Sequence, residues 1–255
     1  MNKVLLLLIS VISTFSLMAA DTGARDTRLF ERRTYYATPG KLDDLHARFR
    51  NHTVRLFKKH GMESIGYWIP VDNKENKLVF ILAYPNREAR EKSWKAFLDD
   101  PDWKKAAKES EANGPILYGE KIESIFLEPV DYSPEIKLST RGNRVFEFRT
   151  YEAAPGKLDD LNARFRNHTV NLFAKHGMEN IAYWVKAKGE KDADKILFYI
   201  ISHASPDAAK KSFDDFRKDP DWNSAKTASE KNGSLTAPNG VKSEFYLPTD
   251  YSPMR

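Results

Sequence analysis

The chain has 255 residues, of which 41% are hydrophobic and 30% are charged. This composition is typical of a folded globular protein and excludes a disordered or fibrous chain. Lys and Arg number 41 against 36 Asp and Glu, a formal net charge of +5 that is spread without a run of five like charges. We therefore expect no nucleic-acid partner. The absence of cysteine excludes disulfides, thiolate catalysis and cysteine-ligated metal centres.

Residues 1–20 have the pattern of a secretory signal peptide. Lys3 supplies a short positive segment, residues 4–18 are apolar apart from Ser and Thr, and Ala19-Ala20 precede Asp21. The apolar run has 15 residues, whereas a membrane span needs roughly 20. We therefore expect cleavage near Ala20 and an exported protein, periplasmic or secreted. No later segment is apolar enough to predict a membrane span.

The remainder of the chain contains an internal duplication. Residues 38–68 and residues 154–184 differ at only six of 31 positions, and each copy ends in the sequence DYSP, at 131–134 and at 250–253. Such self-similarity indicates two copies of one structural module. We predict one domain at residues 28–134, a polar linker at 135–144, and a second domain at 145–253.

The first copy predicts alternating strands and helices. Strands are indicated by alternating, aromatic-rich or apolar runs at residues 28–36, 64–71, 78–84 and 121–128. Between the first two, apolar residues recur at helical spacing until Gly61, which is a favourable helix stop. Asn86 can cap a second helix, and Asp100-Pro101 can begin a short third one, as Ser205-Pro206 can begin a helix in the second copy.

This order of elements, β-α-β-β-α-β with one inserted helix, is typical of the ferredoxin-like module of the α+β class. Such a module places its helices on one face of its sheet and leaves the other face to be covered. The duplication supplies that cover within the same chain. We therefore predict two α+β modules whose sheets pack face to face as a pseudo-twofold barrel, in effect an internal pseudo-dimer.

The sequence resembles the NIPSNAP family along nearly all of residues 28–253. The family's E-x-R-x-Y strand, P-G-K turn, H-T helix, H-G helix end and Y/F-W strand are matched in order by Glu31 to Tyr35, Pro39 to Lys41, His52-Thr53, His60-Gly61 and Tyr67-Trp68. Its D-P-D/E-W element is matched twice, at residues 100–103 and 219–222. The resemblance implies the dimeric α/β-barrel superfamily. It implies no established reaction.

The first strand of each copy carries the strongest candidate ligand-binding residues. Because alternate residues of a strand share a face, Glu31, Arg33 and Tyr35 lie together, as do Glu147, Arg149 and Tyr151. If Phe146 and Phe148 pack under the helices, the two Glu-Arg-Tyr sets face the barrel interior. Arg33, Tyr35, Arg149 and Tyr151 could then bind a small polar or anionic ligand. The alternative is that Glu and Arg pair as a buried structural network.

Two histidines and two tyrosines complete the candidate site. His52 and His168 fall on the apolar stripe of the first helix, where a histidine could act as a general base or axial ligand or could simply be a core residue. Tyr67 and Tyr183 could border the barrel cavity, although aromatic strand residues are more often core. The six histidines lack the spacing of a metal site, so we predict no metal and no cofactor.

Three functions are compatible with these patterns. The first is an exported protein that binds a small polar or anionic ligand in the barrel between the repeats. The second is a cofactor-free or haem-dependent oxygenase, because the resembled superfamily includes such enzymes, with His52 or His168 as ligand or base. The third is a protein-interaction scaffold, whose barrel interior would be filled with side chains. Whether the pseudo-dimer forms a further homodimer is left open.

Overall fold

The computed structural model describes residues 26–140, 142 and 144–255. The predicted signal peptide at residues 1–20 lies outside the described residues. Within the described part, no helix has the length and apolar character needed to cross a membrane.

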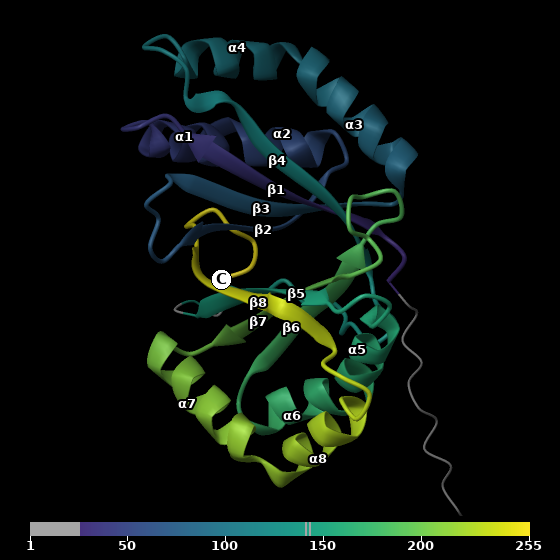
Figure 1. Cartoon of the computed structure of the whole chain (residues 1–255). Coiled ribbons are helices and arrows are strands. Elements are labelled where there is room, and N and C mark those ends of the chain that lie inside the picture. Colours follow the sequence, from purple (N-terminus) through teal and green to yellow (C-terminus); the bar gives the residue numbers. More distant parts are fainter. Residues whose placement is uncertain (1–25, 141, 143) are drawn as a thin grey trace, which may run out of the picture.

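The first repeat forms a four-stranded antiparallel sheet with its helices on one side (Figure 1). Its strands are β1 (Leu29–Ala37), β2 (Glu63–Pro70), β3 (Lys77–Tyr84) and β4 (Leu117–Pro129). Its helical segments are α1 (Leu42–Arg48), the π-helical turn η1 (Phe49–Thr53), α2 (Val54–Lys59), α3 (Arg87–Asp99) and α4 (Pro101–Ser110).

The second repeat has the same elements in the same order. Its strands are β5 (Val145–Ala153), β6 (Glu179–Lys186), β7 (Ile196–His203) and β8 (Thr236–Pro248). Its helical segments are α5 (Leu158–Arg164), η2 (Phe165–Thr169), α6 (Val170–Lys175), α7 (Pro206–Lys218) and α8 (Pro220–Ser229).

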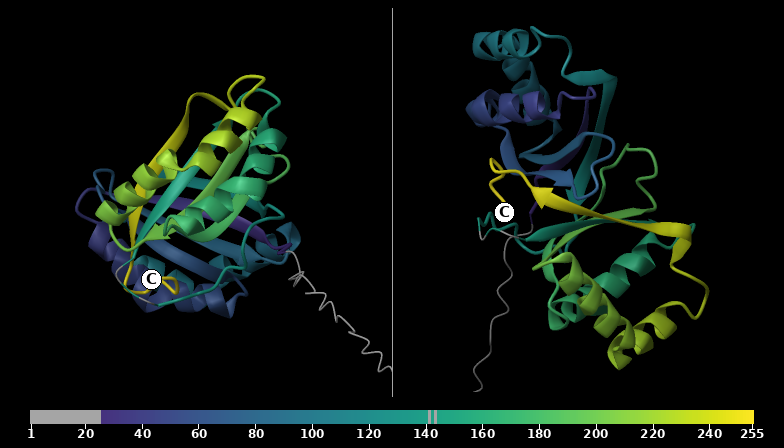
Figure 2. Two further views of the ribbon diagram at one scale, coloured as in Figure 1. Left: turned by 90° about the horizontal axis from the view of Figure 1, so that it is seen from below. Right: turned by 90° about the vertical axis from the view of Figure 1, so that its left-hand side faces the viewer.

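The two sheets join into one closed barrel with the strand order β1-β3-β2-β8-β5-β7-β6-β4. β2 pairs with β8 through the register Trp68↔Pro248 to Pro70↔Tyr246, and β4 pairs with β6 from Leu127↔Lys186 to Pro129↔Trp184. Helices cover the outside of each half, so the views in Figure 2 show two helix layers with the barrel between them. The predicted α+β architecture, two ferredoxin-like modules forming an internal α/β-barrel, is confirmed.

The predicted helix starts are also present. The Asn86 side chain accepts a hydrogen bond from the Ala89 N–H at 2.9 Å, and the Ser205 hydroxyl accepts one from the Ala208 N–H at 3.0 Å. The Asp100 carboxylate accepts one from the Asp102 N–H at 2.8 Å. Each bond satisfies a backbone donor that the first helical turn leaves without a partner.

Apolar side chains from both sheets make up most of the barrel interior, and the Arg32 guanidinium also lies there, 5.0 Å from the centroid of the Phe198 ring. Phe30 of the first repeat meets Trp184 of the second with ring centroids 5.5 Å apart, and Trp68 meets Phe146 at 5.6 Å. These rings belong to one buried cluster that also contains Phe148. Burial of this surface supplies the cohesion between the repeats.

The DYSP tail of each repeat binds to the other repeat. Asp250 accepts hydrogen bonds from Arg50 at 2.6 and 2.7 Å, and the Ser252 hydroxyl accepts one from the Tyr67 N–H at 3.0 Å. The first tail makes the same bonds in the opposite direction: Arg166 donates to Asp131, and the Tyr183 N–H donates to Ser133. The repeated motif is therefore a pair of crossing contacts between the modules.

Candidate functional site

The two faces of β1 and β5 are oriented opposite to the sequence-based expectation. Phe30, Phe146 and Phe148 lie inside the barrel, whereas the Glu-Arg-Tyr sets lie beneath the helices, so Arg33, Tyr35, Arg149 and Tyr151 line spaces between sheet and helices. The expectation that these side chains line the barrel interior is wrong. Ionised groups need hydrogen-bond partners when buried, and the helix side supplies them to Glu31 and Glu147, whereas the barrel face is mainly apolar.

Glu31 is the centre of the polar network in the first repeat. It is fully buried, and it accepts hydrogen bonds from Arg33 at 2.5 Å and from Arg90 of α3 at 2.8 and 3.0 Å. Ser124, Tyr84 and Trp94 donate three more. Burial alone would raise the pKa of Glu31, but the bonds from Arg90 and the charge of Arg33 outweigh it and lower the pKa to about 2.

A carboxylate held in this way is ionised at neutral pH and is a poor proton acceptor. Glu31 therefore fixes the position of Arg33 rather than acting as a base. The buried ion pairing that the sequence suggested as an alternative role for these residues is present in both repeats, as Glu31–Arg33 and Glu147–Arg149.

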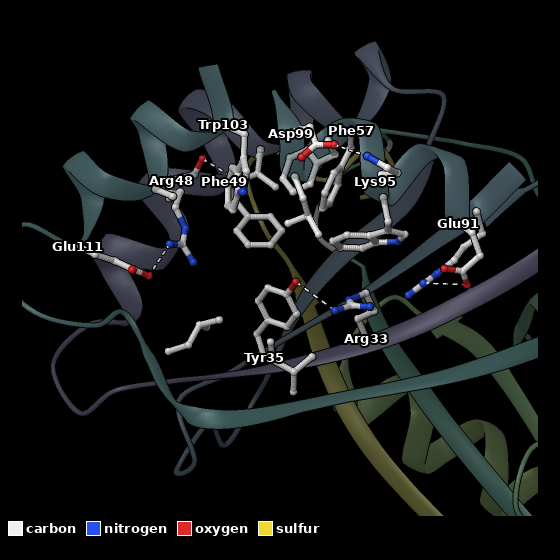
Figure 3. Close-up of a pocket in the computed structure, with 18 residues that line it drawn as sticks. Arg33, Tyr35, Arg48, Phe49, Phe57, Glu91, Lys95, Asp99, Trp103 and Glu111 are labelled. Atoms are coloured by element: carbon white, nitrogen blue, oxygen red, sulfur yellow. Dashed lines mark hydrogen bonds and ion pairs between the residues drawn. The ribbon is translucent and has the colours of Figure 1, made fainter. Parts of the chain in front are cut away.

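Above this network lies a cavity of about 730 Å³, here called the first cavity, between the sheet and the helices of the first repeat. Figure 3 shows Tyr35 and Arg33 on its sheet side, with Phe49, Phe57 and Trp103 opposite them. Six aromatic side chains line it: Tyr35, Phe49, Phe57, Trp94, Phe97 and Trp103. Such walls favour an apolar, planar body.

Two guanidinium groups, those of Arg33 and Arg48, line different sides of the first cavity (Figure 3). The Arg33 guanidinium lies 4.3 Å from the centroid of the Trp94 ring. The Arg48 guanidinium lies 5.4 Å from the centroid of the Trp103 ring. Arg48 is held by a hydrogen bond of 2.9 Å from Nη1 to Glu111. The buried Nε–H of Arg33 and that of Arg48 have no acceptor among the described residues, so the protein leaves part of their hydrogen-bonding capacity unused.

The π-helical turn η1 determines which side chains of the first helix enter this cavity. Thr53 and Phe49 line the cavity, and the Thr53 hydroxyl donates to the Arg48 carbonyl at 3.2 Å. A π turn adds one residue to the helical turn, so the buried apolar stripe of the first helix passes through Thr53 instead of His52. The second repeat has the same bond from Thr169 to Arg164.

The predicted histidines are consequently outside the cavities. His52 borders a shallow surface groove beside Lys41 and Asp44, and His168 is exposed. The expected position of these two residues on the buried stripe is wrong, because the π turn rotates them outwards. Neither histidine is placed to bind a ligand held between the sheet and the helices.

Tyr67 and Tyr183 are fully buried on the helix side of their strands but line neither cavity. The Tyr67 hydroxyl hydrogen-bonds Ser64 at 2.6 Å, and its ring contacts Tyr251 of the crossing tail. Burial raises the pKa of Tyr67. Both tyrosines are core residues at the contact with the opposite tail.

The second repeat contains a smaller cavity of about 310 Å³, here called the second cavity, in the equivalent place. Arg149, Tyr151, Arg164 and Thr169 occupy the positions of Arg33, Tyr35, Arg48 and Thr53. Below it, Glu147 bonds Arg149, His203 and Ser243. Ala209 stands where the first repeat has Arg90.

Sequence reasoning missed Arg48, Thr53, Arg90 and Trp94 as cavity residues. Arg48 and Thr53 lie in the segment ARFRNHT, which both copies share, and an arginine three residues after the buried Leu45 was a signal that could have been used. Arg90 and Trp94 differ between the copies, and only their contacts with Glu31 reveal their role.

The described residues contain no group of three or more His, Cys, Asp or Glu side chains that could hold a metal ion. Guanidinium groups and aromatic rings, which are not metal ligands, make up much of the lining of both cavities, and the carboxylates that also line them do not form such a group.

Comparisons with solved structures identify proteins of the same fold. A monooxygenase-like protein from Lactobacillus acidophilus NCFM aligns over 88% of this chain and 94% of its own, with 13% identity and a TM-score of 0.55. An anthrone oxidase-like protein aligns over 90% and 95%, with 13% identity and a TM-score of 0.57. At these identities the likeness shows the shared fold alone. A search of curated proteins finds no match.

Relatives of a single repeat are also found. An uncharacterized NIPSNAP domain protein from Burkholderia xenovorans is 26% identical and covers 42% of this chain and 99% of its own, with a TM-score of 0.37. The NIPSNAP family model matches twice, at residues 30–134 and 146–253. The two matches cover most of the chain, which therefore belongs to the NIPSNAP family as a tandem form.

Proposed function

We propose that this protein binds a small, mainly apolar molecule with one negative charge in the first cavity. The observation that carries the proposal is the combination, in one space of about 730 Å³, of six aromatic walls with the Arg33 and Arg48 guanidinium groups. A ligand body would stack on the rings, and its anionic oxygen atoms would accept hydrogen bonds from a guanidinium edge.

The charges around the first cavity favour a singly charged ligand. Its cationic lining residues are Arg33, Arg48, Arg90 and Lys95, and its acidic ones are Glu91, Asp99 and Glu111. The lining therefore has an excess of one positive charge, and the buried Glu31 lies behind it. A strongly charged ligand would also lose hydration on entering a space with mostly aromatic walls.

Binding is favoured over proton-transfer chemistry by the state of the buried acid. Glu31 has a pKa of about 2, so it does not accept a proton near neutrality. The sequence-based enzyme hypothesis required His52 or His168 as a base or axial ligand. Both side chains are turned away from the cavities.

An oxygenase remains the second candidate function. Its support is the overall fold shared with monooxygenase-like and anthrone oxidase-like proteins, and its substrate would occupy the same aromatic cavity. Measurement of oxygen uptake distinguishes the two functions. A binding protein saturated with its ligand consumes no oxygen, whereas an oxygenase consumes oxygen at a rate proportional to the enzyme concentration.

A thermal-shift screen tests the binding proposal. Aromatic monocarboxylates should raise the melting temperature, while the corresponding neutral amides and small aliphatic carboxylates should raise it less. At a hundredfold excess over its Kd, a ligand adds about 2.7 kcal/mol to the free energy of unfolding, which such a screen detects. If amides and carboxylates stabilise the protein equally, the role assigned to the guanidinium groups is wrong.

Export is part of the same proposal. The support is the apolar run at residues 4–18 followed by Ala19-Ala20. N-terminal sequencing of the protein recovered outside the cytoplasm tests it: a mature chain that begins at Asp21 is expected, and an intact N-terminus on a cytoplasmic protein would contradict export.

A further inference from the structure

The second cavity differs from the first at its mouth. Leu98 and Ala107, which line the first cavity from α3 and α4, correspond to Arg217 and Lys226 in α7 and α8. On the strand side, Leu117 corresponds to Thr236. The duplication fixes these correspondences because both repeats contain DPDW at the start of the last helix. Three apolar positions have therefore become cationic or hydroxylic.

These substitutions change the charge of the second cavity. Its cationic lining residues are Arg149, Arg164, Arg217 and Lys226, and Glu230 is its one acidic lining residue in the described part of the chain. Arg164 donates to Glu230 at 2.7 Å, and Arg217 donates to Asp214 at 2.6 Å. Lys226 makes no ion pair with a described residue. The excess of positive charge is larger than in the first cavity, while the volume is less than half.

We propose that the second cavity binds a small, strongly anionic molecule, namely a phosphate group as inorganic phosphate or as a small phosphate monoester. Arg164 is the deep contact, because its side chain is only 5% exposed and is oriented by Glu230. Arg217 and Lys226 lie at the mouth and are exposed. Guanidinium groups match the tetrahedral oxygen atoms of phosphate, and lysine adds a mobile point charge.

Hydroxyl groups at the strand end complete the surroundings. Ser234 and Thr236 line the second cavity, and the Ser234 hydroxyl donates to the Thr236 carbonyl. The first cavity has Leu117 in place of Thr236. The two repeats therefore offer one apolar site for a singly charged ligand and one polar site for a phosphate group. This inference does not depend on the ligand of the first cavity.

Titration calorimetry at constant ionic strength tests the inference with two probes, inorganic phosphate and glycerol phosphate. The decisive variant is Arg217→Leu/Lys226→Ala, which installs residues that the first repeat already carries at these positions. The matched control, Lys211→Ala/Lys231→Ala, removes the same charge from exposed lysines of the second repeat that do not line the cavity.

We expect saturable binding of at least one probe by the wild-type protein, a loss of about fivefold or more in affinity in Arg217→Leu/Lys226→Ala, and a smaller change in the control. Stronger binding of glycerol phosphate would identify a monoester as the natural class, and stronger binding of inorganic phosphate would identify the free ion. The inference is overturned if the wild-type protein binds neither probe, or if both variants lose affinity equally.

Ligand binding in the first cavity shows whether the variant Arg217→Leu/Lys226→Ala is folded. Arg217→Leu/Lys226→Ala should keep the wild-type circular dichroism spectrum and the wild-type melting shift with an aromatic carboxylate. If wild-type protein shows no such shift, the spectrum and the melting curve alone establish folding, so a failure of the first-cavity proposal leaves this test intact.

Discussion

Tyr84 and His203 occupy the same position at the ends of β3 and β7, and each contacts the buried glutamate of its own repeat. The Tyr84 hydroxyl lies 3.1 Å from Glu31 Oε2, and His203 Nε2 lies 2.9 Å from Glu147 Oε2. In the first repeat Arg90 adds a second cation beside the glutamate, whereas the second repeat has Ala209 at that position, which carries no charge. The two copies thus satisfy one buried acid with different partners.

Arg90 should be important for the stability of the first repeat. Replacing it with Ala, the residue of the second copy, removes both hydrogen bonds to Glu31 and leaves a tyrosine where the second copy has a histidine. We expect the free energy of unfolding in urea to fall by about 2 kcal/mol, since bonds to charged groups are worth roughly 1.5–3 kcal/mol. Lys92→Ala, on the exposed side of α3, should change it by less than about 0.5 kcal/mol. Equal effects of the two substitutions would contradict the network described here.

The low pKa of Glu31 makes the stability of the protein depend on acid. Its pKa of about 2 lies below the ordinary value of 4.5, so the ionised carboxylate stabilises the fold at pH above 4.5. That contribution, about 3 kcal/mol, is lost as the pH falls from 4.5 through 2. Urea unfolding across this range should show a smaller loss of stability in Glu31→Gln than in wild type. An identical pH dependence in both proteins would show that Glu31 is not the group responsible.

The crossing tails should stabilise the opposite repeat. Ser252→Ala leaves the buried N–H of Tyr67 without its acceptor, and Ser133→Ala does the same to Tyr183. Each should lower the free energy of unfolding by about 1–3 kcal/mol, measured by urea titration. Ser64→Ala, within a single repeat, provides a comparison that removes a tyrosine hydroxyl partner without affecting a tail. Wild-type stability in both tail variants would mean that the tails contribute little.

Gly66 makes room for a buried tryptophan of the barrel core. A Cβ at this position would lie 2.1 Å from the Trp68 ring, which is fully buried. The equivalent residue of the second repeat is Ala182, so a methyl group is tolerated there. We expect Gly66→Ala to lower the free energy of unfolding by about 1–3 kcal/mol through overpacking. The opposite substitution in the second repeat, Ala182→Gly, should lower it by no more than about 1 kcal/mol. A neutral Gly66→Ala substitution in thermal unfolding would contradict the packing described.

The fold could be predicted because local and global signals agree. The same module is indicated by the duplication, by the strand alternation and by the caps at Asn86, Asp100 and Ser205. Because each sheet leaves one face uncovered by helices, two copies bury these faces by packing them against each other. The DYSP tails were visible as a repeated motif. Their partners were not, because Arg50 and Asp250 are 200 residues apart in the chain.

The site could be predicted only in part. Alternation identified Glu31, Arg33 and Tyr35 as sharing one face of the strand. It does not say which face lies inside the barrel when both faces carry bulky residues. The other face was itself ambiguous, because Arg32 in the first copy corresponds to Phe148 in the second. The π turn shifts the buried stripe from His52 to Thr53, and a shift of one residue in helical hydrogen bonding has no reliable sequence signal. Arg90 and Trp94 approach Glu31 only after α3 packs on the sheet.

The binding of an anionic, aromatic ligand in the first cavity is the central claim, and titration calorimetry with naphthoate tests it most directly. Arg48→Gln removes one of the two guanidinium groups of the first cavity, and Arg217→Leu/Lys226→Ala changes only the second cavity. The account predicts one site in the wild-type protein, an affinity reduced by about tenfold in the first variant because a charge-assisted hydrogen bond to the carboxylate is lost, and wild-type affinity in the second variant. Unchanged affinity in the first variant, or a loss confined to the second, would contradict it.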